Sequence, residues 1–404
     1  MPRPIEAVVH PAALAHNLGV ARAHAQGARV WAVVKANAYG HGIERAFEGL
    51  RGADGFALLD LAEASALRTL GWRGPVLLLE GCFEPRDLEL CSRLNLWHVV
   101  HQSEQIDWLA AHKTQQPHRV FLKMNSGMNR LGFATASTRS AYARLAALPQ
   151  VDEISLMTHF SDADGARGIA HQIALFDSTT ADLPGERSLS NSAALLRHGA
   201  DAGAGAVRND WVRAGILSYG SAPDYPEHDS LHWGLQPTMT LRTRVIATQM
   251  LQPGDTVGYG SAYRAERSMR IGIAACGYAD GYPRHAGSGA PVLVAQQHGA
   301  PVLVTQQHGA PVLVTQQHGA PVLVDGQRST TVGRVSMDML ALDLSAPALM
   351  SSGIGSEVVL WGRAANGAVL TIDEVARAAA TIGYELMCAV APRVPIHADT
   401  AASA

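Results

Sequence analysis

The sequence is poor in cysteine and contains no long apolar run. Its four cysteines are scattered and form no Cys-x-x-Cys pair, which argues against a disulfide framework or a zinc knuckle. No window approaches the length of a membrane-spanning helix, and the amino-terminal run MPRPIEAVVHPAAL lacks the apolar core of a secretory signal. We therefore expect a cytoplasmic protein without a membrane partner.

Charge of either sign is also scarce. Charged residues make up 17% of the chain, the formal net charge is -3, and no basic block occurs, so nothing indicates nucleic acid as a partner. We interpret most of the 18 histidines as surface or supporting residues and predict no metal site. With 404 residues and an apolar fraction of 47%, the chain can bury a large core and form two domains.

The first half of the chain alternates short apolar runs with alanine-rich stretches of helical period. Eight such repeats of strand and helix favour an α/β fold of the (β/α)8 TIM-barrel type, which we assign to residues 1–230. The predicted strands are 30–34, 56–59, 76–79, 96–100, 120–122, 154–157, 187–189 and 211–216.

The second half has a different pattern of predicted secondary structure. β-rich segments punctuated by turns follow the loop 221–230, and they predict a mainly β domain over residues 231–404 with one helix at 372–382. Within this domain the decapeptide APVLVxQQHG occurs three times over 290–319, and a divergent copy, APVLVDGQRS, starts at Ala320. We predict that the repeat is an insertion, that only one copy occupies the original strand of the domain, and that the others form an added hairpin or loop.

Polar or titratable residues follow seven of the predicted barrel strands, and another lies within the eighth. The carboxyl ends of barrel strands are where this fold places its chemistry, and several cations there indicate an anionic ligand. These residues are Lys35, Asp60, Glu80, His101, Lys123, His159, Asn191 and Arg213.

Lys35 stands at the exit of the first buried strand. Partial burial lowers the pKa of a lysine, so a neutral amine becomes available for a Schiff base with an aldehyde. The alternative is a surface lysine whose stem lies along the barrel wall, which would be the better interpretation if Lys35 stood alone.

Five motifs in order give the chain a resemblance to a known family. They are VVKANAYGHG, KMNSGMNRLGF, THF with SNSAA downstream, VRAGILSYG, and the carboxyl-terminal pair VGYGSAY and GRVSMD. The chain resembles the alanine racemases from Lys35 to about Tyr384. The resemblance implies an enzyme that depends on pyridoxal 5'-phosphate, with a barrel followed by a β domain and with an active site shared across a homodimer.

The resemblance also implies the residues that bind the cofactor. Lys35 resembles the lysine that holds it, Arg213 the arginine that faces the pyridine nitrogen, and His159 the histidine packed against the ring and bonded to Arg213. The phosphate contacts implied by the motifs are Tyr39, Ser192, Gly215, Ile216 and Tyr384.

Two acid-base groups are implied for proton exchange on the two faces of the substrate. Lys35 is one, and Tyr263 of the partner subunit is the other, provided that neighbouring positive charge lowers the pKa of its phenol. Arg130 and the Met337 backbone amide resemble the groups that hold the substrate carboxylate. Tyr278 resembles a residue of the access corridor, and Lys123 matches a position that is carbamylated in some members.

The function implied is interconversion of L- and D-alanine, either to supply D-alanine for peptidoglycan or for alanine catabolism. Three alternatives remain: a broad-specificity amino-acid racemase, a related amino-acid decarboxylase, and a noncatalytic pyridoxal-phosphate carrier. Arg213, which stands where a decarboxylase would have an acid, argues against the second. A β domain that contains Tyr263 argues against the third.

Overall fold

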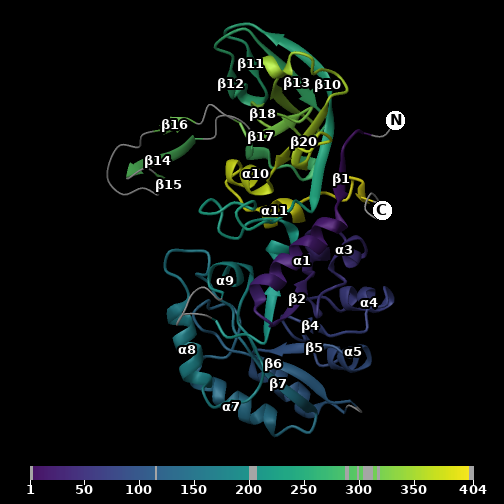
Figure 1. The fold of residues 1–404 in the computed structure, drawn as a ribbon, viewed down its shortest axis with the longest axis vertical. Helices are drawn as coiled ribbons and strands as arrows, with labels where there is room; N and C mark the ends of the chain where they lie inside the picture. Colours follow the sequence, from purple (N-terminus) through teal and green to yellow (C-terminus); the bar gives the residue numbers. More distant parts are fainter. Residues whose placement is uncertain are drawn as a thin grey trace. The chain divides into compact units, whose positions relative to one another are not determined.

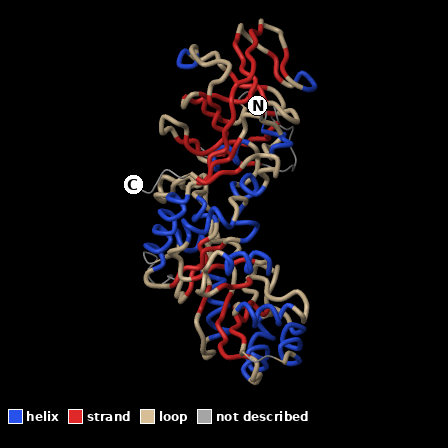
Figure 2. The backbone as a smooth tube through the Cα atoms, turned by 90° about the vertical axis from the view of Figure 1, so that its right-hand side faces the viewer, coloured by secondary structure: helices blue, strands red, loops and turns tan. Residues whose placement is uncertain are grey.

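The computed structural model describes residues 3–113, 116–199, 207–286, 291–297, 300–303, 313–315 and 319–399. The chain forms two compact units (Figure 1): a barrel unit, His10–Thr238, and a C-terminal unit that combines Met239–Asp399 with the first nine residues. Strands dominate the C-terminal unit, whereas helices surround the strands of the barrel unit (Figure 2).

The barrel unit contains the parallel eight-stranded sheet that the sequence predicts. The strands follow the order β8-β7-β6-β5-β4-β3-β2-β9. Backbone hydrogen bonds from the Asp210 N–H to the Arg187 carbonyl (2.9 Å) and from the Arg213 N–H to the Ser190 carbonyl (3.0 Å) join β9 to β8 and so close the ring of strands. The (β/α)8 barrel is thus confirmed. Its strands are β2 (Arg29–Val33), β3 (Gly55–Leu58), β4 (Val76–Leu78), β5 (Trp97–Val100), β6 (His118–Lys123), β7 (Val151–Met157), β8 (Arg187–Ser188) and β9 (Trp211–Ala214).

Helices connect these strands, and several begin where the sequence supplies a cap. Pro11 starts α1, and the side chains of Asp60 and Asn191 accept backbone N–H bonds at the starts of α4 and α9. No helix in the described residues is both long and apolar enough to cross a membrane. The helices are α1 (Pro11–Ala25), α3 (Ile43–Leu50), α4 (Leu61–Thr69), α5 (Asp87–Leu94), α6 (Ser103–Ala111), α7 (Thr135–Ala146), α8 (Ala170–Thr180) and α9 (Ser192–Arg197).

Aromatic side chains fill the barrel near the amino ends of its strands. Trp31 and Trp211 stack with ring centroids 4.0 Å apart, and Trp97 and Phe121 pack edge-on against Trp31 at 5.5 and 6.2 Å. All four side chains are buried. This packing closes one end of the barrel and leaves the carboxyl ends of the strands for polar residues.

The C-terminal unit is built on a nine-stranded sheet in which long β10 pairs with β1, β13 and β20. The unit also contains a two-stranded sheet and two short helices; α10 (Ile372–Ala378) starts with a capping box of Thr371 and Glu374, and α11 is Gly383–Cys388. The strands are β1 (Glu6–Val9), β10 (Met239–Leu251), β11 (Thr256–Val257), β12 (Tyr263–Arg264), β13 (Met269–Ala274), β17 (Pro321–Val324), β18 (Gln327–Val332), β19 (Leu340–Asp343), β20 (Glu357–Arg363), β21 (Val369–Leu370) and β22 (Ile396–Ala398).

The observed division differs from the predicted boundary at residue 230 in two ways. The boundary lies after Thr238, because the linker is tied to the barrel, for example by bonds between the Asn17 side chain and the Gln236 backbone (2.8 Å). The first strand, β1, belongs to the C-terminal unit, because it pairs with β10 and β22. The helix expected over 372–382 also ends earlier, at Ala378.

The described parts of the decapeptide repeat lie in two different sheets. Only the divergent fourth copy, as β17, joins the nine-stranded sheet, whereas β14 (Pro291–Gln297), β15 (Ala300–Leu303) and β16 (Leu313–Thr315) form a separate sheet. The fourth copy alone contains Asp325–Gly326, and both residues have positive φ, 47° and 75°. This is the two-residue turn that a tight hairpin requires, so it pairs β17 with β18.

Candidate active site

Lys35 stands just after β2 and begins a left-handed turn, labelled α2 (Lys35–Tyr39). Its side chain is half-buried. The next four residues, none of them glycine, have φ values of 54°, 53°, 53° and 51°. The left-handed conformation costs about 1–2 kcal/mol of conformational free energy for each non-glycine residue. The turn therefore stores roughly 4–8 kcal/mol of strain, and contacts with its surroundings must hold it.

Polar contacts hold the exposed side of this turn. The Glu63 carboxylate accepts a hydrogen bond from the Asn37 backbone N–H at 2.7 Å, and the Asn37 side chain accepts one from the Ile43 backbone N–H at 3.0 Å. Burial raises the pKa of Glu63, and the bond from Asn37 opposes that change. Nothing in the sequence marks Glu63 as part of the site, because it stands on another helix, α4, outside the motifs.

Aromatic packing holds the buried side of the turn. Tyr39 stacks on Tyr219 with ring centroids 4.4 Å apart, and the Tyr219 hydroxyl donates to the Val33 carbonyl at 2.9 Å. His41 is buried and its Nδ1 lies 3.0 Å from the Tyr39 carbonyl. Burial lowers the pKa of His41 to about 4. His41 and Tyr219 lie inside the motifs, yet nothing in their spacing assigned them these roles.

Ser192, Gly215 and Tyr39 form a small polar cradle between two loops. The Ser192 hydroxyl accepts the backbone N–H of Gly215 at 3.0 Å and that of Leu217 at 3.4 Å. A Cβ on Gly215 would lie 2.9 Å from the Tyr39 hydroxyl and 3.6 Å from the Ser192 hydroxyl oxygen. Glycine therefore keeps the space between the two hydroxyls clear. β9 ends at Ala214 rather than at Ile216 as predicted, because Gly215 turns the chain into η2 (Ile216–Tyr219).

Arg213 is buried, and no carboxylate among the described residues pairs with it. Its terminal nitrogens donate to the backbone carbonyls of Ser188 (2.6 Å), Thr158 (2.8 Å) and Leu189 (3.0 Å). Burial lowers the pKa of Arg213 to about 10, so the guanidinium is still charged at neutral pH. Within the described part of the chain its Nε–H has no acceptor, which leaves one donor for a ligand.

His159 lies beside Arg213, as the resemblance implied. A terminal nitrogen of Arg213 lies 3.4 Å from His159 Nδ1 and donates to it. Burial, together with the charges of Arg213 and Lys123, holds the pKa of His159 well below its usual value. The ring is therefore neutral at physiological pH, and its Nδ1 serves as an acceptor.

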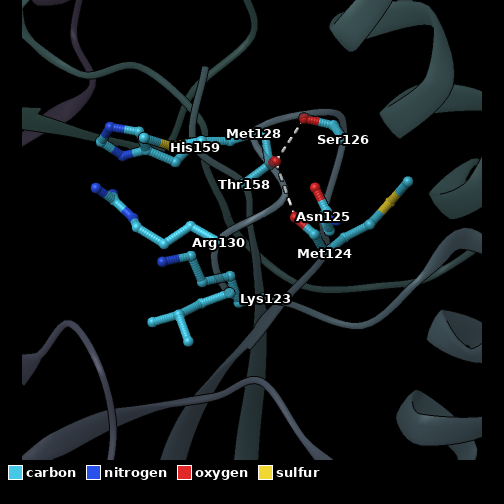
Figure 3. A pocket seen from close by; sticks show the side chains of 9 residues that line it. Lys123, Met124, Asn125, Ser126, Met128, Arg130, Thr158 and His159 are labelled. Carbon is cyan, nitrogen blue, oxygen red and sulfur yellow. Dashed lines mark hydrogen bonds between the residues drawn. The ribbon is translucent and has the colours of Figure 1, made fainter. Parts of the chain in front are cut away.

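Lys123 and Arg130 line a small pocket next to His159. Figure 3 shows that the nitrogen-bearing ends of these three side chains lie on the same side of it. Thr158 ties the pocket wall together by contacts with the Ser126 hydroxyl (2.7 Å) and the Met124 carbonyl (2.9 Å). Burial and the nearby charges of Arg213 and Arg130 lower the pKa of Lys123 to about 8.

Arg130 projects from a loop shaped by Asn125. The Asn125 side chain accepts the backbone N–H groups of Gly127 and Asn129, both at 3.0 Å, and its amide donates to the Asn129 side chain at 2.9 Å. The Arg130 side chain is exposed and forms no ion pair with any residue that the structure describes. It can therefore grip an external carboxylate.

Other strand-end residues have structural roles. Asp60 and Asn191 cap helices, and His101 Nε2 lies 3.0 Å from the Glu80 carbonyl. Besides burial, the charges of Arg213, Arg130 and Lys35 lower the pKa of Lys123, and the Glu80 carboxylate raises it. Cations thus outnumber carboxylates among these neighbours of Lys123, which suits an anionic ligand.

The remaining predicted site residues belong to the C-terminal unit. Tyr263 is half-buried, and its hydroxyl donates to the Met269 sulfur at 3.2 Å. Burial and the nearby carboxylate of Asp343 raise the pKa of Tyr263, which is the opposite of what the proton-transfer role requires. Met337 is 52% exposed, and Tyr384 lies half-buried in α11.

The chain is similar to known alanine racemases in sequence and in structure. The family models described as "Alanine racemase, N-terminal domain" and "Alanine racemase, C-terminal domain" match residues 9–223 and residues 238–305 and 307–398. An alanine racemase of Paracidovorax citrulli is 67% identical over 99% of this chain and 100% of its own length. One of Methylibium petroleiphilum is equally similar, with 67% identity over 99% and 100%. The crystal structure of biosynthetic alanine racemase from Pseudomonas aeruginosa superposes with a TM-score of 0.84 at 40% identity, over 98% of this chain and 99% of that one.

Proposed function

This chain belongs to the alanine racemase family, and we propose that it interconverts L- and D-alanine by exchanging the α-proton between two protein groups, with pyridoxal 5'-phosphate as cofactor. Membership of the family makes it an isomerase. The observation that carries the proposal is the strained turn that presents Lys35 and Tyr39 at a cationic barrel mouth, because such a turn persists only where surrounding contacts fix it.

The donors of the barrel unit fit pyridoxal 5'-phosphate. The hydroxyls of Tyr39 and Ser192 converge on the space that Gly215 keeps clear, and they would hold the phosphate. The unused Nε–H of Arg213 would face the pyridine nitrogen, and the Lys35 amine would hold the aldehyde carbon. When bound, the cofactor withdraws electrons from the substrate Cα and makes its proton removable.

Arg213 and His159 would tune that electron withdrawal. Because Arg213 keeps its proton at neutral pH, it can donate a hydrogen bond to the ring nitrogen but does not protonate it. Neutral His159 adds no further positive charge beside the ring. By leaving that nitrogen unprotonated, Arg213 would favour rapid return of the proton to Cα, which suits racemisation better than side reactions.

Lys35 would hold or donate the proton on one face of the substrate, and Tyr263 of a second subunit would do so on the other. The surroundings of Tyr263 in its own unit raise the pKa of the phenol, so a base at this position needs cations from elsewhere. The barrel mouth of a partner subunit offers Lys123, Arg130 and Arg213. This supports a homodimer with shared sites.

Substrate binding would use groups that suit a carboxylate. The exposed Arg130 guanidinium and the backbone amide of the partner's Met337 would fix the carboxylate of alanine. With a pKa of about 8, Lys123 has a neutral fraction near neutral pH, as carbamylation would require. D-alanine made this way would serve peptidoglycan synthesis or alanine catabolism. A cytoplasmic location is part of the proposal, and four scattered cysteines fit a reducing compartment.

Absorbance and circular dichroism test the proposal together. The purified protein should show a visible band from bound pyridoxal phosphate, and the Lys35→Ala variant should lack it. With L-alanine, optical activity should decay to zero. A band without decay would favour a noncatalytic carrier, and equal rates on bulkier amino acids would favour the broad-specificity alternative.

A further inference from the structure

An arginine–aspartate network (Arg3, Asp280, Asp338 and Arg393) joins the amino- and carboxyl-terminal segments of the C-terminal unit to two of its loops. Arg3 donates to both carboxylate oxygens of Asp280, at 3.0 and 3.1 Å, and Arg393 Nε donates to the same carboxylate at 2.7 Å. Arg393 also reaches the Asp338 carboxylate at 2.6 Å, and Arg3 the Asp338 backbone carbonyl at 2.7 Å. Each arginine therefore bridges both loops.

Asp280 is the centre of this network. Its side chain is fully buried, whereas those of Arg3 and Arg393 are 39% and 40% exposed. The Gly277 backbone N–H also donates to it, at 2.9 Å. Burial would raise the pKa of Asp280, but the hydrogen bonds from Arg393, Gly277 and Arg3 lower it overall. The buried carboxylate is thus charged, and removing either arginine would leave that charge only partly compensated.

The two loops also contact each other through their backbones. The N–H of Tyr278 donates to the Ser336 carbonyl and the N–H of Ala279 to the Met337 carbonyl, both at 3.0 Å. A Cβ on Gly277 would lie only 2.4 Å from the Met337 carbonyl oxygen, so the loops approach as closely as a glycine allows. Asp280 and Asp338 each stand within two residues of these contacts.

Met337 and Tyr278 nevertheless present exposed side chains, 52% and 38%. We propose that Arg3 and Arg393 are positioning residues that fix the Met337 backbone amide where it receives the substrate carboxylate of the other subunit. This inference rests on the proposed function and adds to it: the two ends of the chain determine substrate affinity. A misplacement of about 1 Å in such a loop is enough to weaken binding strongly.

Another ion pair in the same unit offers a matched control. Arg328 on β18 grips Glu374 on α10 with two bonds, 2.7 and 3.1 Å. It holds elements that do not contain Met337 or Tyr278. Losing it therefore removes an arginine–carboxylate contact of similar geometry without releasing the two loops.

The test compares the cofactor-loaded wild-type enzyme with Arg393→Gln, Arg3→Gln and Arg328→Gln. For each, kcat and KM are measured with L- and D-alanine, together with inhibition by propionate, which is alanine without its amino group. Thermal midpoints and visible spectra report folding and cofactor content.

We expect the KM for both enantiomers and the propionate inhibition constant to rise about tenfold in Arg393→Gln and Arg3→Gln, the effect of roughly one charge-assisted hydrogen bond. The value of kcat should fall less than about threefold, and Arg328→Gln should keep the wild-type KM. Arg3, on a terminal segment, decides the question if Arg393→Gln does not fold.

Two results overturn the inference and are distinguishable. If the wild-type enzyme racemises alanine and both network variants lose thermal stability but keep its KM, the network only stabilises the fold. If the wild-type enzyme loaded with cofactor does not racemise alanine, the proposed function fails, and the inference fails with it.

Discussion

Replacing Glu63 by alanine should loosen the turn that presents Lys35 and Tyr39. The turn has four consecutive left-handed residues, and the Glu63 carboxylate accepts the backbone N–H of one of them, Asn37, at 2.7 Å. The aromatic contact of Tyr39 with Tyr219 would remain. The variant therefore tests whether the polar side of the turn is needed to keep its strained shape.

The expected loss of cofactor affinity follows from the hydrogen bond between Glu63 and Asn37 that the substitution removes. A hydrogen bond to a charged group contributes about 1.5–3 kcal/mol, and the solvent-accessible position of this one favours the lower value. Against roughly 4–8 kcal/mol of stored strain, losing about 1.5 kcal/mol should weaken cofactor binding about tenfold. Glu63→Gln keeps an acceptor oxygen and removes a charge that burial disfavours, so we expect a change below about threefold.

Titration of the cofactor-free protein with pyridoxal phosphate, followed by the visible band, gives the dissociation constants. Glu48→Ala is the control, because Glu48, on the neighbouring helix α3, forms an exposed ion pair at 3.2 Å with Arg51, which follows that helix. Racemase activity at saturating cofactor should recover in Glu63→Ala. Wild-type cofactor affinity in Glu63→Ala, or equal losses in it and the Glu48 control, would refute the role assigned to Glu63.

Three further predictions concern other parts of the molecule. Tyr263→Phe should reduce turnover severely while the visible band stays, and normal racemisation of both enantiomers would contradict the second-base assignment. The folded-state pKa of Lys123, about 8, lies below the ordinary 10.5, so between these values the unfolded chain binds more protons and stability rises with pH. Denaturant titrations give the free energy of unfolding, which between pH 8 and pH 10.5 should rise by about 3 kcal/mol more in wild type than in Lys123→Met. The same change with pH in both proteins would exclude this. Excising residues 290–319 should leave activity within about twofold in a racemisation assay, because the Asp325–Gly326 hairpin stays intact; collapse of the fold would show that the repeat is required.

The sequence determined the barrel and supplied most residues of the candidate site. Each barrel strand is a short apolar run next to a polar residue, and both signals are local, so the strands lie within a few residues of their predicted positions. The motifs likewise brought Lys35, Tyr39, Ser192 and Arg213 into one unit. The lowered pKa predicted for Lys35 stays a prediction.

Only the tertiary structure decided where β1 belongs, which residues support the left-handed turn, and how Arg3 reaches Asp280. β1 has the pattern of any short strand, and its partners β10 and β22 are distant in sequence. From the sequence, Glu63 is an acidic residue in the first turn of α4, as in many helices. Only the folded structure shows that its carboxylate accepts the Asn37 backbone N–H. Periodicity records which face of an element is buried, but it carries no information about which distant element covers that face. That choice is made when the whole chain packs, because only then do backbone donors and buried charges find their partners.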